Sequence, residues 1–273
     1  MKYTIQKKIT TACLLFVLII SVISAATLLQ EKNTAKVPSY EKQDISSIAD
    51  KNSWTEEDYA ILWEQTGLGK TILQTVQNDN DRKEILLAEQ KRFFGAPDHI
   101  CTGLSLFSKA EIITDPADYY PLYDLQPGDV LLTKSTHTLC YRHGHSAIYI
   151  GDGMILEAAA IGLDTNTAEA DLWGRYPSGI HLRFKGNNDV GAQAAEYAKA
   201  ELAGDKYHLL AGAFGIGEST DHTQCAHLIW AAYRSCGVDI SDRDFPITPK
   251  SILESGQFEI LRCWGFDPKD LNW

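Results

Sequence analysis

The sequence predicts an α+β protein in which short strands are grouped first and helices follow them. Four stretches between residues 129 and 184 have the length and alternation of β-strands. Two helical stretches come after them, over 190–203 and 224–236, and a last strand is expected over 258–262. The fold expected from this order is an antiparallel sheet packed against helices, and about 240 residues suffice to bury its core.

The amino-terminal 30 residues have the composition of an export segment. Lys2, Lys7 and Lys8 precede an apolar run over 9–29. The small residues at 24–26 suit a signal peptidase, but a helix of about 21 residues is also long enough to cross a bilayer. Residues 1–30 are therefore predicted to be a cleaved signal peptide or a retained membrane anchor. The rest of the chain is expected to be secreted or held on the outer face of the cytoplasmic membrane.

The charge of the chain limits its partners. The whole chain carries −11, and without the three lysines of the export segment the remainder is near −14. An acidic surface repels phosphate backbones, so nucleic acid is not expected as a partner.

The cysteines are too few and too widely spaced for a disulfide scaffold. Five remain outside the export segment, and an odd number leaves at least one thiol unpaired. We expect mostly free thiols, of which one is reactive. The five are Cys101, Cys140, Cys225, Cys236 and Cys263.

Composition and periodicity divide the remainder of the chain into three parts. These are a polar linker (31–51), a helical segment (52–100) and the main domain (101–273). In the helical segment, Ser53 and Glu56 have the spacing of a capping box that begins a helix. A second helix is expected over 81–94.

A predicted hairpin carries a histidine and a carboxylate. The alternation of the first strand places His145, Ala147 and Tyr149 on one face, with the core on the other side. A three-residue loop over 151–153 pairs Ala147 with Glu157 and brings the carboxylate within reach of His145. A two-residue turn would shift the register by one and turn the carboxylate away. The sequence therefore predicts the three-residue loop.

Cys225 follows Thr223, which is a plausible N-cap, so its thiol is expected in the first turn of a helix. A helix amino terminus and a protonated imidazole both favour a thiolate. We expect Cys225 to be a nucleophile, His145 its acid and base, and Glu157 the group that orients the imidazole. Backbone N–H groups at the helix start would bind the oxyanion.

A metal site is the alternative that the same region offers. The candidate ligands are His137, Cys140, His143, His145 and Glu157. Their spacing does not match a common zinc pattern, and strand alternation would scatter the side chains. No metal and no cofactor are expected.

These segments resemble the NlpC superfamily of papain-like cell-wall cysteine peptidases and amidases. His145 and Glu157 have the family's spacing of twelve residues around a Gly-x-Gly turn. Because the histidine precedes the cysteine, the order resembles the circularly permuted branch. Further similar segments are 126–132, 203–207 and 248–249.

The resemblance implies a permuted papain-like fold and an exported thiol hydrolase that cleaves an amide bond, with cell-wall peptide as the substrate class. Cys225, His145 and Glu157 would be catalytic. Tyr207, His143 and Gln224 are expected to bind the substrate.

Two other functions stay open. The cysteine-x-histidine order at Cys225 and His227 is similar to that of lecithin retinol acyltransferase relatives, which implies a lipid-directed acyltransferase or thioesterase on the same site. A non-catalytic binding module of the same fold is the third.

Overall fold

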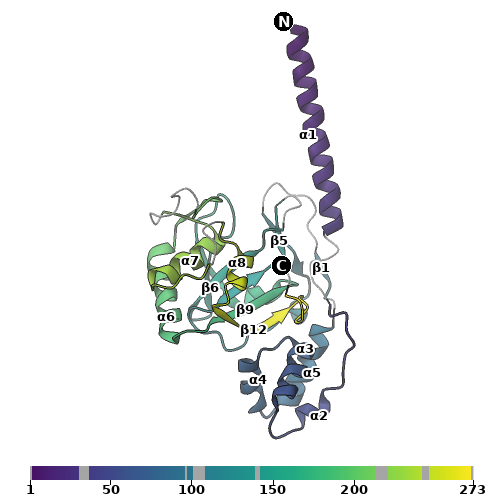
Figure 1. The fold of residues 1–273 in the computed structure, drawn as a ribbon, viewed down its shortest axis with the longest axis vertical. Helices are drawn as coiled ribbons and strands as arrows, with labels where there is room; N and C mark the ends of the chain where they lie inside the picture. Colours follow the sequence, from purple (N-terminus) through teal and green to yellow (C-terminus); the bar gives the residue numbers. More distant parts are fainter. Residues whose placement is uncertain are drawn as a thin grey trace.

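A six-stranded antiparallel sheet organises the main part of the molecule, with helices beside it (Figure 1). The computed structural model describes residues 2–30, 37–95, 97–100, 108–138, 142–212, 221–241, 246–271 and 273. The strand order is β12–β9–β4–β6–β7–β8. The strands are β4 (Val130–Thr133), β6 (His145–Gly151), β7 (Met154–Glu157), β8 (Asn166–Glu169), β9 (Gly179–Phe184) and β12 (Phe258–Trp264). The predicted α+β class is confirmed.

Both faces of the sheet are covered. Because successive side chains of a strand point to opposite sides, each strand contributes to both cores. Ile148 and Ile150 of β6 belong to the larger core, together with residues of the helices. The helices of this core are α6 (Asn188–Tyr197), its π-helical continuation (Ala198–Leu202), α7 (Cys225–Ser235) and α8 (Pro249–Glu254). On the other face Ala147 and Tyr149 pack with Trp173 of the 3₁₀ segment η3 (Ala170–Arg175). This second cover was not predicted.

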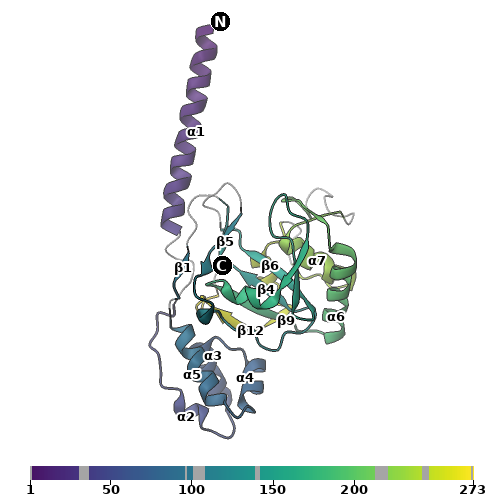
Figure 2. The same ribbon diagram turned by 180° about the vertical axis from the view of Figure 1, so that it is seen from behind.

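Four helices form a unit at the end of the molecule opposite α1 (Lys2–Gln30), around a core to which Leu261 of β12 also contributes (Figures 1 and 2). They are α2 (Ser46–Ala49), α3 (Glu56–Thr66), α4 (Lys70–Gln77) and α5 (Arg82–Phe93). The capping box of α3 consists of Thr55 and Asp58, not of Ser53 and Glu56. Residues 45–49, assigned to the linker from their polarity, instead contain α2 and bury Ile45 completely.

Short strands and a 3₁₀ turn lie outside the six-stranded sheet. Three two-stranded pairings occur among the described residues: β1 with β3, β2 with β5, and β10 with β11. The bounds are β1 (His99–Ile100), β2 (Lys109–Ala110), β3 (Ile112–Ile113), η2 (Pro116–Asp118), β5 (Thr136–His137), β10 (Lys206–Tyr207) and β11 (His222–Thr223).

The helical unit is joined to the outer edge of the sheet. Leu68, between α3 and α4, forms a β-bridge with Arg262 of β12. Arg262 is 1 % exposed and forms an ion pair with Glu89 of α5, which is equally buried. Gly67, which ends α3, has a positive φ of 69°, and a Cβ there would meet the carbonyl oxygen of Cys263 at 2.1 Å. The close approach of the two backbones therefore requires glycine.

The segment predicted to direct export forms α1 (Lys2–Gln30), which extends away from the rest of the molecule (Figure 1). Its described apolar side chains, such as Leu14 and Phe16, are exposed. No helix within the described residues combines the length and the apolarity needed to span a membrane. The export or anchor function of residues 1–30 stays a prediction.

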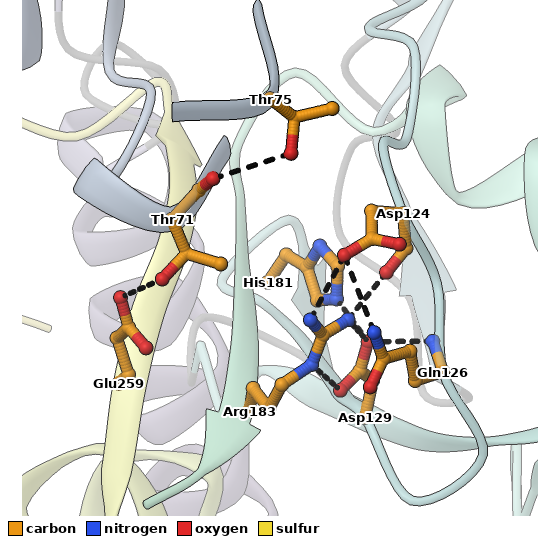
Figure 3. A network of polar contacts seen from close by, with 8 residues as sticks. All are labelled: Thr71, Thr75, Asp124, Gln126, Asp129, His181, Arg183 and Glu259. Carbon is orange, nitrogen blue, oxygen red and sulfur yellow. Dashed lines mark hydrogen bonds and ion pairs between the residues drawn. The ribbon is translucent and has the colours of Figure 1, made fainter. Parts of the chain in front are cut away.

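Asp129 is the centre of a buried polar network where the chain enters β4 (Figure 3). Its carboxylate lies 2.8 Å from His181 Nε2 and accepts hydrogen bonds from Arg183 Nε at 2.9 Å and Nη2 at 2.7 Å. It also accepts the backbone N–H of Gln126. Burial alone would raise the pKa of Asp129, but the bonds from His181 and Arg183 outweigh it and hold the pKa below its ordinary value.

We expect Asp129→Asn to lower the free energy of unfolding by about 3 kcal/mol at neutral pH, because buried donors of His181 and Arg183 would lose their carboxylate. The pKa of Asp129 is lower in the folded than in the unfolded state. The carboxylate therefore stabilises fully above the unfolded-state pKa, and this contribution is lost as the pH falls through the folded-state pKa. In urea denaturation, the difference between wild type and variant should shrink below about pH 4.

Asp124→Asn is the matched control. Asp124 binds the same Arg183 but its side chain is 43 % exposed. Its loss should cost less than about 1 kcal/mol. Equal losses for the two variants would contradict the central place of Asp129.

Candidate functional site

The turn between β6 and β7 has two residues, which corrects the predicted three-residue loop. Asp152 and Gly153 form it, with positive φ values of 53° and 73°. Positive φ at both central positions is typical of the tight hairpin turns that match the twist of the flanking strands. By itself, such a turn would turn Glu157 away from His145.

A β-bulge directly before the turn reverses that effect. The register shifts by one residue after Tyr149, and beyond the shift Ile148 pairs with Leu156. If this register continues by one residue, Ala147 lies opposite Glu157, which is the pairing expected from the three-residue loop. Glu157 therefore lies on the same face of the hairpin as His145, as predicted.

His145 and Glu157 are in direct contact, with 2.8 Å between Nε2 and Oε2. Their side chains are only 6 % and 15 % exposed. Burial would raise the pKa of Glu157, but the hydrogen bond and the charge of His145 hold it below its ordinary value. Burial would likewise lower the pKa of His145, but its hydrogen bonds to Cys225 and Glu157 raise it well above its ordinary value. The charged forms of the two groups stabilise each other.

Cys225 lies in the first turn of α7, as predicted, but it is the first helical residue because the N-cap is Gln224 and not Thr223. The Oε1 atom of Gln224 accepts the backbone N–H of Ala226 at 2.9 Å. Thr223 is turned elsewhere, and its hydroxyl lies 3.0 Å from Nδ1 of His227. A cap from Gln224 still leaves the thiol in the first helical turn, where the positive end of the helix favours an anion.

The thiol of Cys225 meets His145 without a packed layer between them. Burial would raise the pKa of Cys225, but the hydrogen bond and the charge of His145, with a further contribution from Ser146, lower it. Glu157 occupies Nε2 of the imidazole, which leaves Nδ1 for the thiol. The arrangement favours a thiolate and an imidazolium over two neutral groups.

Tyr207 lies beside the thiol, at the end of β10. Burial raises the pKa of its hydroxyl, and the negative charge of Cys225 raises it further. The side chain is partly exposed, so it can contact a molecule bound at Cys225.

His143 and Gln224, the other predicted substrate-binding residues, hold local backbone and side-chain contacts. His143 Nδ1 lies 2.6 Å from the carbonyl oxygen of Gly144, and its Nε2 lies 3.1 Å from the Thr138 hydroxyl. Gln224 Nε2 donates to the carbonyl of Ile247 at 2.9 Å. Gln224 flanks the thiol, with 3.5 Å between its Oε1 and Sγ of Cys225.

Trp173 completes the site and was missed in the sequence. Its ring stacks on that of His145, with 5.5 Å between centroids and 26° between planes. Its indole also helps to lower the pKa of the Glu157 carboxyl. The segment that carries Trp173 has neither helical nor strand periodicity, so no pattern in the sequence placed it near the histidine.

The metal alternative depended on a cluster whose Cys140 lies outside the described residues. Within the described part of the chain, no group of three or more His, Cys, Asp or Glu could hold a metal ion. Cys225, Cys236 and Cys263 are free thiols there, together with Cys13. Burial raises the pKa of Cys263, so Cys225 is the thiol whose surroundings favour ionisation.

No family model, curated protein or solved structure matches this chain. The likeness of its motifs to the NlpC superfamily therefore stays a prediction. The geometry of Cys225, His145 and Glu157 carries the functional conclusion.

Proposed function

We propose that this protein is an exported thiol hydrolase of the permuted papain-like kind, which cleaves an amide bond through an acyl-enzyme intermediate. The observation that carries the proposal is the position of the His145 imidazole, which lies 2.8 Å from Glu157 and lowers the pKa of the Cys225 thiol. Thiol catalysis needs a nucleophile, a base beside it and a group that orients the base. Cys225, His145 and Glu157 have the chemistry for these three roles.

In the first step, the thiolate of Cys225 attacks the carbonyl carbon and a C–S bond forms. The backbone N–H of Cys225, at the start of α7, is available for the oxyanion. Gln224 flanks this position, and only one of its two amide hydrogens is needed for the bond to Ile247. The second hydrogen can donate to the oxyanion.

In the second step, the tetrahedral intermediate collapses and the C–N bond breaks. His145 gives its Nδ1 proton to the departing amine, and Glu157 keeps the imidazole in place through Nε2. Water then attacks the thioester, its proton goes to His145, and the C–S bond breaks to restore the thiolate. Trp173 holds the imidazole plane throughout, because its ring stacks on that of His145.

The papain-like fold is supported by two arrangements. The helix that begins at Cys225 packs on the sheet, and its core residues are shared with β6. The histidine strand precedes the cysteine helix in the chain, which is the order of the permuted branch. The export segment favours an extracytoplasmic substrate, and the family resemblance favours cell-wall peptides.

Cys225→Ala should abolish turnover, because no other group in the site can form the acyl intermediate. Release of fragments from purified peptidoglycan, followed by mass spectrometry, should fall by more than about 1,000-fold. Cys236→Ala, at the carboxyl end of the same helix, is the control and should keep wild-type activity. Turnover that survives in Cys225→Ala would refute the assignment, and an inactive wild type with an ordinary Cys225 thiol would favour the non-catalytic module.

The reactivity of Cys225 should depend on Glu157. Because His145 lowers the pKa of the thiol, alkylation by iodoacetamide should reach half of its maximal rate below the ordinary cysteine pKa of about 8.5. In Glu157→Gln the imidazolium loses its carboxylate, so the pKa of His145 falls, that of Cys225 rises, and the inflection moves to higher pH. On the acid side of the inflection, the rate should drop about tenfold for each pKa unit by which the inflection moves.

Site-resolved mass spectrometry of the Cys225 peptide separates this thiol from the others. Glu169→Gln, at the exposed end of β8, is the control and should leave the profile unchanged. Identical profiles for wild type and Glu157→Gln would exclude Glu157 from the site.

A further inference from the structure

Two tight turns flank the candidate site. In the turn over 160–163 the N–H of Leu163 donates to the carbonyl of Ala160 at 3.1 Å, and Gly162 has a φ of 87°. In the turn over 208–211 the N–H of Ala211 donates to the carbonyl of His208 at 2.9 Å. Both are closed turns with a defined backbone.

The residues at these turns are bulky and aliphatic where polar residues are usual. Central turn positions favour glycine, proline, asparagine, aspartate and serine. Here Ile161 and Leu163 are 65 % and 53 % exposed, and Leu209 and Leu210 are 65 % and 42 % exposed. A group of exposed aliphatic side chains of this kind marks a surface that meets an apolar partner.

The two turns lie at the same end of one antiparallel pairing. Asp164 forms an antiparallel bridge with Lys206, and the N–H of Thr165 donates to the carbonyl of Asp205 at 2.7 Å. In an antiparallel pair, the chain that enters one strand lies beside the chain that leaves the other. The turn before Asp164 and the turn after Lys206 therefore project together.

The same connections place the turns next to the thiol. The first turn begins three residues after Glu157. The second directly follows Tyr207, which pairs with Thr223 two residues before Cys225. The four aliphatic side chains, Ile161, Leu163, Leu209 and Leu210, are called the apolar tips below.

We infer that the apolar tips insert into the surface of a lipid bilayer and hold the site of Cys225 against it. Projecting aliphatic turns on a defined backbone suit a fluid apolar phase, into which each tip can enter separately. The chain also exposes aliphatic side chains along α1, the predicted export segment. The loops at the α7 end of the domain and α1 extend to the same side of the molecule (Figures 1 and 2).

The charge of the chain selects the kind of bilayer. With a net charge near −14 outside the export segment, the protein gains nothing from anionic headgroups. Docking by the apolar tips should therefore occur on zwitterionic phosphatidylcholine and should persist at high salt. The docking stands without the proposed function. Only one consequence rests on the proposed function, namely that the amide substrate of Cys225 is a membrane-bound molecule.

Quenching by brominated lipid measures the insertion. The full chain is incorporated into vesicles of phosphatidylcholine with brominated acyl chains, with unbrominated vesicles as the reference. In Leu209→Trp, more than half of the added tryptophan fluorescence should be lost. Leu87→Trp is the control, because Leu87 is an exposed leucine on α5 in the helical unit. Equal quenching in the two variants, or none in either, would overturn the inference.

A second reagent pair tests whether the site faces the bilayer. A lipid with a maleimide headgroup, placed in the same vesicles, should label Cys225 in the wild type. The triple variant Ile161→Ser, Leu209→Ser and Leu210→Ser should label about tenfold more slowly, because the effective concentration at the surface is lost. Its reaction with soluble iodoacetamide should not change. Equal slowing with both reagents would indicate a damaged site and contradict the inference.

The outcomes separate docking from chemistry. Quenching of Leu209→Trp should persist when Cys225→Ala is added, so a failure of the proposed reaction leaves the docking result unaffected. Docking by a second copy of the chain would instead appear as a lipid-free dimer in sedimentation that the triple serine variant abolishes. That result would overturn the lipid inference.

Discussion

The register of the β6–β7 hairpin is the constraint on which the candidate site depends. Side chains alternate along a strand, so a slip of one residue would move Glu157 to the opposite face of the sheet. The bulge after Tyr149 fixes the register although the turn has only two residues. Because β6 also pairs with β4 and packs under α7, the same register positions His145 beside Cys225.

The site also shows how burial and charge are balanced. Burial acts against the charged forms of Cys225, His145 and Glu157, and in isolation it would leave each of them neutral. Their mutual contacts reverse this in all three. Trp173 covers the imidazole with an apolar ring, and Glu157 holds its Nε2, so the two together orient the imidazole. Loss of any one of the three groups should lower the stability of the fold, because the remaining charges stay buried without their partner.

Much of the fold was predictable, because strands and helices leave periodic patterns. The strand of His145, the hairpin partner of Glu157 and the helix of Cys225 all lie where alternation and spacing predicted them. The bulge was not predictable, since a three-residue loop and a two-residue turn with a bulge give the same strand register, and the glycines at 151 and 153 suit both. The cap by Gln224 was missed because glutamine is an uncommon N-cap, and Trp173 was missed because its contacts are non-local.

The buried ion pair of Arg262 and Glu89 makes the helical unit inseparable from the sheet. Arg262 belongs to the edge strand of the main domain, but its carboxylate partner comes from α5. A chain without α2 to α5 would carry the Arg262 guanidinium on its edge strand without the carboxylate of Glu89. Such a chain would need an apolar residue in place of the arginine. The helical unit is thus an integral part of the folded protein and not a detachable module.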